Sequence, residues 1–248
     1  VRIGGYSEYF CNLTPELQTQ SYLSQYRLDL YMNGEYRRKQ VGFVVRTFSQ
    51  YVREQPADLS FLELYGSLSL SPRLRMSVGR QRHEWGKGYA FNPVGYVNGQ
   101  KDPENPDLAL AGRASATVTY NRSLSSDALR NLSLTAVVLP PEPGPSVKLA
   151  PAEDTGIALK AYALVHDVDI EVMAFLRRDR PTRLGLDFAA NLRENVEIHG
   201  EASYARDVRR LIVERDALGA TEADGISYLA GIRYLHRSGT TLIVEHYH

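Results

Sequence analysis

The stretch that decides the fold reads Arg73-Leu-Arg-Met-Ser-Val-Gly-Arg-Gln-Arg-His-Glu-Trp85, and Gly86-Lys-Gly88 follows it directly. Polar and apolar residues alternate before Trp85, which is the pattern of a β-strand with two different faces. From residue 85 to residue 111 the chain is rich in Gly, Pro and Asn, which interrupt regular structure. Alternation resumes at Gly112-Arg113. Loops of this length are uncommon in compact proteins and are usually functional. We therefore take 85–111 as one long loop around which the other strands are arranged.

The same alternation runs through most of the chain and predicts thirteen strands and no helix. In 59–71, for example, Leu62, Leu64 and Leu68 share one face, and Glu63, Tyr65 and Ser67 share the other. Several segments have the 9–11 residues or so that a tilted strand needs to cross a bilayer. The predicted strands are 2–10, 19–32, 36–53, 59–71, 73–84, 112–121, 131–139, 154–165, 167–177, 183–192, 195–206, 224–236 and 240–248.

The connections alternate in length, which predicts short turns at one rim of a barrel and longer loops at the other. This asymmetry is typical of outer-membrane barrels. The predicted fold class is all-β, an antiparallel up-and-down transmembrane β-barrel that forms a single domain over residues 1–248. The short connections lie at Asn33-Gly34-Glu35, Ser71-Pro72, His166, Arg193-Glu194 and Arg237-Ser238-Gly239, and the longer ones at 54–57, 85–111, 140–153, 178–182 and 207–223.

A soluble sandwich or propeller also alternates apolar and polar residues. Here the polar face mixes Gly, Ser, Tyr, Arg and Glu, and no blade-length repeat occurs, which favours the barrel. Thirteen is odd, whereas single-chain bacterial barrels have even strand numbers and pair their edges. We therefore expect 14 to 16 strands, with the remainder C-terminal to His248, and we expect 2–10 and 240–248 to be edges of an open sheet.

Composition excludes several classes of function. The 29 basic and 29 acidic residues balance, so no broad attraction to nucleic acid is implied. The sequence contains no run of about 18 apolar residues, so no transmembrane helix is predicted. Cys11 is the only cysteine, which excludes an internal disulfide. No motif predicts a cofactor. The mean hydropathy of −0.33 is compatible with a barrel, because a barrel buries only alternate residues in lipid.

If the more apolar face of each strand contacts lipid, the other face lines a lumen that carries two groups of charges. Opposed charges across a narrow channel would create a transverse field that orients polar solutes. Alternatively, neighbouring lumen charges simply pair with one another. The predicted basic arc comprises Arg27, Arg46, Arg75, Arg113 and Lys160, and the predicted acidic arc comprises Asp169, Glu171, Asp187, Glu197 and Glu201.

The loop 85–111 is far longer than a hairpin requires, and its aromatic and proline residues give it stiff anchors. We expect it to fold into or over the lumen as a constriction, with Trp85, Tyr89, Phe91 and Tyr96 as its principal aromatic residues. Strict alternation turns Arg80 and Arg82 outward, unless Gly79 marks a bulge that redirects them.

Four short segments, Gly79-Arg-Gln81, Trp85-Gly86-Lys-Gly88, Asn92-Pro93 and Asp102-Pro103, resemble the strand-and-loop signature of outer-membrane porins of Gram-negative bacteria. The resemblance covers residues 60–115. It implies passive transport of small polar or charged solutes by a protein of the bacterial outer membrane, in contact with outer-membrane lipid. It supplies no established solute-binding residues. A homo-oligomer is compatible with this interpretation.

The alternative is an outer-membrane barrel without transport, either a scaffold around a lumen partner or an enzyme. Glu197, His199 and Glu201 share one face, so a carboxylate could orient His199 as a base. No nucleophilic partner is recognisable, and two carboxylates with one histidine on a flat strand cannot enclose zinc unaided. We therefore expect no catalytic residue and no metal site.

Overall fold

The computed structural model describes residues 2–11, 22–52, 58–99, 111–126, 128–141, 155–177, 181–214 and 217–248. In these residues the regular structure is entirely β. The strands are β1 (Arg2–Cys11), β2 (Tyr22–Arg38), β3 (Val41–Val52), β4 (Asp58–Ser69), β5 (Leu74–Gln81), β6 (Arg113–Ser123), β7 (Leu129–Leu139), β8 (Gly156–Val165), β9 (Val168–Leu176), β10 (Arg183–Arg193), β11 (Val196–Glu214), β12 (Ala217–Leu235) and β13 (Thr241–Tyr247).

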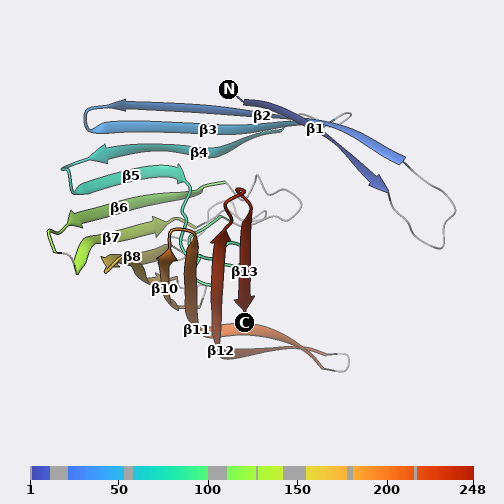
Figure 1. The fold of residues 1–248 in the computed structure, drawn as a ribbon. Helices are drawn as coiled ribbons and strands as arrows, with labels where there is room; N and C mark the ends of the chain where they lie inside the picture. The colour runs from blue at the N-terminus through green and yellow to red at the C-terminus, as the bar shows by residue number, and fades with distance from the viewer. Residues whose placement is uncertain are drawn as a thin grey trace.

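The strands form one sheet in which each strand pairs antiparallel with its neighbour in the chain, from β1 to β13. This confirms the predicted all-β, antiparallel, up-and-down fold class. The sheet is strongly curled, and β1 and β13 are its two edges in the described part of the chain (Figure 1). None of the described residues belongs to a helix long and apolar enough to span a membrane.

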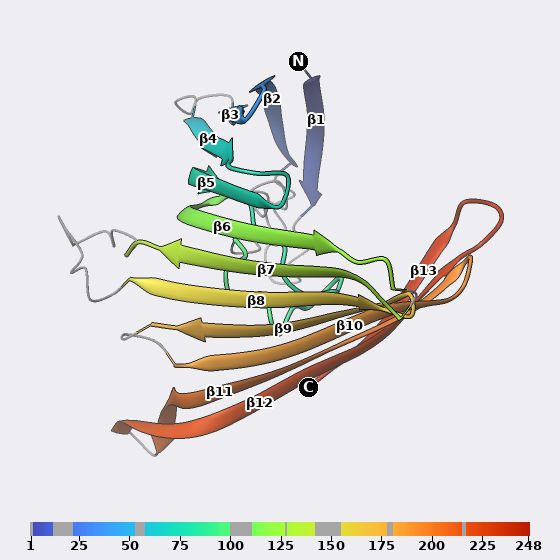
Figure 2. The same ribbon diagram turned by 90° about the vertical axis from the view of Figure 1, so that its left-hand side faces the viewer.

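The two faces of the sheet differ as the alternation predicts. On β9 and β10, Val172, Leu184 and Leu186 are exposed on the outer face. Their neighbours Glu171 and Asp187 are buried on the inner face, against which residues 85–99 lie. Figure 2 shows these residues as a coil behind β6–β9, inside the curl of the sheet. The period-two alternation therefore separates an apolar outer surface from a mixed inner one.

The hydrophobic core is a thin layer between this coil and the inner face. Burying each large apolar side chain is worth roughly 1.5–3 kcal/mol, so the cluster stabilises the docked coil as well as the wall. The coil contributes Trp85, Val94, Tyr96 and Val97, and strands β7, β8 and β9 contribute Val137, Leu139, Ala158, Met173 and Phe175.

The predicted hairpin turn at Asn33-Gly34 is wrong. Strand β2 continues through it, with Asn33 opposite Arg46 and Gly34 opposite Val45. The turn lies at Lys39 and Gln40, where Lys39 adopts a φ of 50°. Asn-Gly is only a local preference for a tight turn. Here the continuous pairing of β2 with β3 overrides this local preference.

The long loop predicted at 207–223 is also wrong in the described residues. Strand β11 bulges between Ala205 and Val208 and then pairs with β12 as far as Glu214 opposite Ala217. The two strands form a hairpin that extends well past their neighbours (Figure 1). Asp207, at the bulge, has a φ of 57°. One bulge thus redirects the pair without ending it, which composition alone did not reveal.

Candidate functional site

Residues 85–98 form an excursion whose two ends are tied together. The backbone N–H of Trp85 donates to Oδ1 of Asn98 at 2.8 Å, and Nδ2 of Asn98 donates to the carbonyl of Trp85 at 2.8 Å. Gly86 turns the chain with a φ of 93°, and a Cβ there would lie 1.8 Å from Oδ1 of Asn92. A left-handed backbone with no room for a side chain requires glycine. Contacts within the coil therefore contribute to its shape, in addition to its contacts with the wall.

Glu201 on β11 binds the coil through its backbone. One carboxylate oxygen accepts hydrogen bonds from the N–H groups of Lys87 at 2.5 Å and Gly88 at 2.6 Å, and the other accepts from Val94 at 3.2 Å. The side chain is only 3% exposed. A charged acceptor that satisfies several N–H groups makes strong hydrogen bonds, so Glu201 is a main anchor of the coil.

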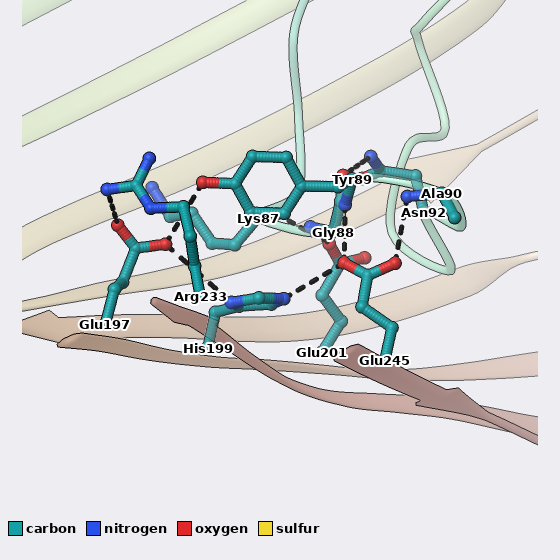
Figure 3. Close-up of polar contacts among 10 residues, drawn as sticks. All are labelled: Lys87, Gly88, Tyr89, Ala90, Asn92, Glu197, His199, Glu201, Arg233 and Glu245. Atoms are coloured by element: carbon teal, nitrogen blue, oxygen red, sulfur yellow. Dashed lines mark hydrogen bonds and ion pairs between the residues drawn. The ribbon is translucent and has the colours of Figure 1, made fainter. Parts of the chain in front are cut away.

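Glu245 on β13 is a second anchor beside it (Figure 3). Its two oxygens accept from the backbone N–H groups of Tyr89 at 2.6 Å and Ala90 at 2.9 Å. Nε2 of His199 lies 3.0 Å from the same carboxylate. The edge strand of the described sheet therefore contacts the coil directly, and the interaction spans 156 positions of sequence.

Aromatic residues supply further contacts between the coil and the wall. The hydroxyl of Tyr96 lies 2.8 Å from that of Ser203 on β11, and Phe91 stacks on Tyr247 with ring centroids 4.8 Å apart. Trp85 and Tyr96 are buried, whereas Tyr89 and Phe91 are partly exposed. The four predicted loop aromatics thus all lie on the inner side of the sheet; their role in a constriction remains a prediction.

Lysine side chains fill the space between the carboxylates. Glu171 on β9 lies 3.2 Å from Nζ of Lys87 and 3.2 Å from Nζ of Lys160, so two ammonium groups share one carboxylate. Burial alone would lower the pKa of Lys87, but Glu171 and Asp187 outweigh it and raise that pKa above its ordinary value. The ammonium of Lys160 also lies 5.5 Å from the ring centroid of Trp85.

The predicted acidic residues lie on the inner face, but each is engaged or buried. Asp187 is 0% exposed, and its oxygens accept no hydrogen bond within the described residues. Glu197 pairs with Arg233 at 2.7 Å and accepts a hydrogen bond from the hydroxyl of Tyr89 at 3.3 Å. Asp169 accepts a hydrogen bond from the hydroxyl of Tyr162 at 2.5 Å. Of the predicted acidic arc, Glu171, Glu197 and Glu201 bond to the coil in this structure.

The predicted basic residues are spread along the inner face of β3 to β8. Arg46 pairs with buried Glu63 at 2.6 Å, and Arg75 donates to the hydroxyl of Ser67 at 3.1 Å. Arg113 is half-buried at the start of β6. Arg27 belongs to β2, but its side chain lies outside the described residues. The role of these residues in lining a pore stays a prediction.

Gly79 does not mark a bulge, because β5 pairs with both neighbours without a register shift. It has a φ of 132°, and a Cβ would lie 2.3 Å from the carbonyl oxygen of Leu64. Arg80 is exposed on the outer face, opposite to buried Gln81. Arg82 lies beyond the end of β5, where it forms an ion pair with Glu84. The end of the strand, and not a bulge, redirects Arg82.

A polar hollow of about 390 Å³ adjoins the coil on the inner face of β4 to β8. Gln81 organises its floor: Nε2 donates to the hydroxyls of Ser115 at 3.0 Å and Thr117 at 3.1 Å, and its carbonyl accepts from Ser77 at 2.6 Å. This hydroxyl network was not predicted. The alternation of Thr117 and Thr119 with apolar Val118 was the signal that could have revealed it.

His83 lies at the edge of this hollow, with Nε2 2.9 Å from the hydroxyl of Ser115. Burial lowers the pKa of His83 to about 4, and the positive charges of Arg113 and Lys160 act in the same direction. The imidazole is therefore neutral near pH 7 and contributes hydrogen-bonding capacity without charge.

His199 is enclosed between two carboxylates on the inner face. Its Nδ1 lies 3.7 Å from Glu197 and its Nε2 lies 3.0 Å from Glu245, so both ring nitrogens face carboxylates. Tyr89 covers the ring at a centroid distance of 5.4 Å, and a Cβ on Gly231 would lie 2.1 Å from Nε2. No group of three or more residues that could hold a metal ion occurs in the part of the chain that the structure describes.

No family model matches the chain, and no curated protein matches it. Solved structures of mutants of a porin from Rhodopseudomonas blastica resemble it weakly. One is 11% identical with a TM-score of 0.44, and a triple mutant is 13% identical with a TM-score of 0.43. Each alignment covers 99% of this chain and 93% of the porin. Similarity at this level does not support a function, so the interpretation is based on the strands, the two faces of the sheet and the docked coil.

Proposed function

We propose that this chain forms the wall and constriction of a porin-like channel of the bacterial outer membrane, through which small polar or charged solutes diffuse. The observation that carries the proposal is the docking of residues 85–99 on the inner face by Glu201 and Glu245. Apolar side chains on the outside of a curled sheet and carboxylates on its inside are the reverse of what a soluble protein shows. They match a membrane channel, whose outer surface contacts lipid and whose lumen is polar.

The outer face supports contact with lipid. Large apolar side chains stand exposed along it on strand after strand, among them Leu134 on β7, Leu159 on β8 and Val172 on β9. In water, so large an apolar surface would be covered by a partner or would aggregate. In a bilayer it is the surface that the hydrocarbon solvates, while the pairing of neighbouring strands satisfies the backbone polar groups.

The channel is tested by single-channel recording of the full-length protein in planar bilayers. Removing residues 94–106 deletes Val94 and Tyr96, which bond to β11. The conductance should therefore rise, and larger neutral sugars should pass. Heat-modifiable migration in detergent checks that the shortened protein still folds. Equal conductance and an equal size limit in the two proteins would contradict the constriction, and absence of any current from the folded full-length protein would contradict the channel.

A further inference from the structure

Apart from buried Asp187, the acidic side chains described above on the inner face are engaged by protein groups. Backbone N–H groups bind Glu201 and Glu245, and two ammonium groups share Glu171. Glu63 accepts from the backbone N–H of Arg82 at 3.1 Å in addition to its ion pair with Arg46. A carboxylate that is buried and paired in this way exerts little attraction on a cation in the lumen.

The basic side chains beside the coil are less fully compensated. Arg75 is exposed, and its contact within the described residues is with a neutral hydroxyl, that of Ser67. Lys160 pairs with Glu171, and Lys87 shares that carboxylate. Both Arg75 and Lys160 line the 390 Å³ hollow, where the charges of Arg82 and Glu84 cancel each other. The side chains that line the hollow therefore include more cations than anions.

The hollow also has the hydrogen-bonding groups that an oxyanion requires. Hydroxyls of Thr117, Thr119 and Thr135 line it beside Arg75. A guanidinium presents several donors in a planar fork that matches a carboxylate or phosphate. Arg75 also lines a second hollow of about 180 Å³ with Lys39 and Ser69, towards the turn after β2. The side chain of Arg75 thus lines two adjacent hollows along the inner face.

We infer that the hollow around Arg75 and Lys160 is a binding site for a small anion that carries a carboxylate or phosphate group. The inference rests on the proposed channel and adds its selectivity, because such a site concentrates anions over cations. It differs from the transverse field predicted from the sequence, since the carboxylates of Glu171 and Glu201 bind the coil whereas Arg75 is exposed.

Two measurements test this inference. Trp85 is the only tryptophan and lines the hollow, so its fluorescence should change on titration with inorganic phosphate at constant ionic strength. Arg75→Gln should weaken phosphate binding about tenfold, since it replaces a charged hydrogen-bond donor by a neutral one. In bilayers under a KCl gradient, wild type should prefer chloride, and Arg75→Gln should lower the chloride-to-potassium permeability ratio about threefold.

Arg80→Gln is the matched control, because it removes the same charge from the same strand on the opposite face. It should leave both readouts unchanged. A conducting protein that prefers cations, or equal effects of the two substitutions, would overturn the inference while leaving the channel intact. Phosphate binding that depends on Arg75 in a folded protein without conductance would support the site and refute the channel instead.

Discussion

At the scale of single residues, Glu201 is an anchor of the coil because its carboxylate accepts from the backbone N–H groups of Lys87, Gly88 and Val94. Replacing it by glutamine keeps one acceptor oxygen but places an NH₂ group against a backbone N–H of the coil. Leaving a buried donor unsatisfied costs about 1–3 kcal/mol, so Glu201→Gln should lower the unfolding temperature in detergent and make the channel current noisier. Differential scanning calorimetry and single-channel recording measure the two effects.

Glu194→Gln provides the comparison for this prediction, because Glu194 is exposed at the turn between β10 and β11. It removes the same charge but no buried hydrogen bond, so both measurements should match wild type. If Glu201→Gln behaved like Glu194→Gln, the carboxylate would not be an anchor of the coil.

His83 gives the protein a pH dependence whose sign follows from its low pKa. The ordinary pKa of 6.5 applies when the chain is unfolded, and the folded pKa is about 4. Between these values the unfolded state binds more protons, so the contribution of His83 to stability is complete above pH 6.5 and is lost as the pH falls towards 4. The slope is at most about 1.4 kcal/mol per pH unit.

His83→Gln should therefore lose less stability than wild type between about pH 7.5 and about pH 5, although all other titrating groups remain. Chemical unfolding at several pH values in the same detergent measures the difference. Parallel curves for the two proteins would show that the imidazole titrates normally, and would contradict its burial beside Arg113 and Lys160.

Sequence predicts the face of a residue far better than its partner. Glu201 and His199 were placed on the inner face because side chains alternate along a strand, which is a local property. The bond between Glu201 and the N–H of Gly88 joins positions 113 residues apart and depends on where a loop folds back. No local pattern encodes that, so the anchors could be named only as lumen charges.

At the scale of elements, the coil and the wall fit through Gly185. A Cβ at Gly185 would lie 2.7 Å from the hydroxyl of Tyr96 and 2.7 Å from Cγ1 of Val94. Gly185→Ala should therefore displace the coil without breaking β10, at a cost of about 1–3 kcal/mol. Faster proteolysis within residues 85–111 and a shift of the Trp85 emission would report the displacement.

Gly66→Ala is the control for crowding in a strand, because nothing lies within 4 Å of a Cβ built there. It should leave both the proteolysis rate and the Trp85 emission unchanged. Undisturbed spectra for Gly185→Ala would mean that the coil does not rest on β10.

Strands were predicted well where polar and apolar residues alternate regularly. They were predicted poorly where a turn motif or a loop-like composition lies within paired strands. The strands from β4 to β10 lie within a few residues of their predicted positions. The Asn33-Gly34 turn and the 207–223 loop were wrong because strand pairing continues past Asn33-Gly34 and beyond the bulge at Asp207. Pairing is decided between strands, so one segment read alone does not show where it stops.

At the scale of the whole molecule, strand order and curl follow from a chain of hairpins, each strand pairing with the next. The sequence predicted this order because short turns require antiparallel neighbours. A total of 14 to 16 strands stays a prediction. Membrane insertion belongs to the same scale, because it depends on the whole outer surface rather than on any one strand.

The depth of an outer residue provides the test of insertion. Val172 is 54% exposed at the middle of β9, and Leu192 is 60% exposed near the end of β10. In a bilayer, arginine on the lipid face costs about 2–4 kcal/mol at the midplane and only about 0–1 kcal/mol near the interface. Val172→Arg should therefore impair folding into lipid vesicles much more than Leu192→Arg does, as followed by heat-modifiable migration. A soluble protein would instead tolerate arginine at both exposed positions, because water solvates the charge at either place. Equal folding yields for the two variants would contradict a membrane-spanning sheet, whereas a difference that shrinks in thinner bilayers would tie the cost to depth within the hydrocarbon.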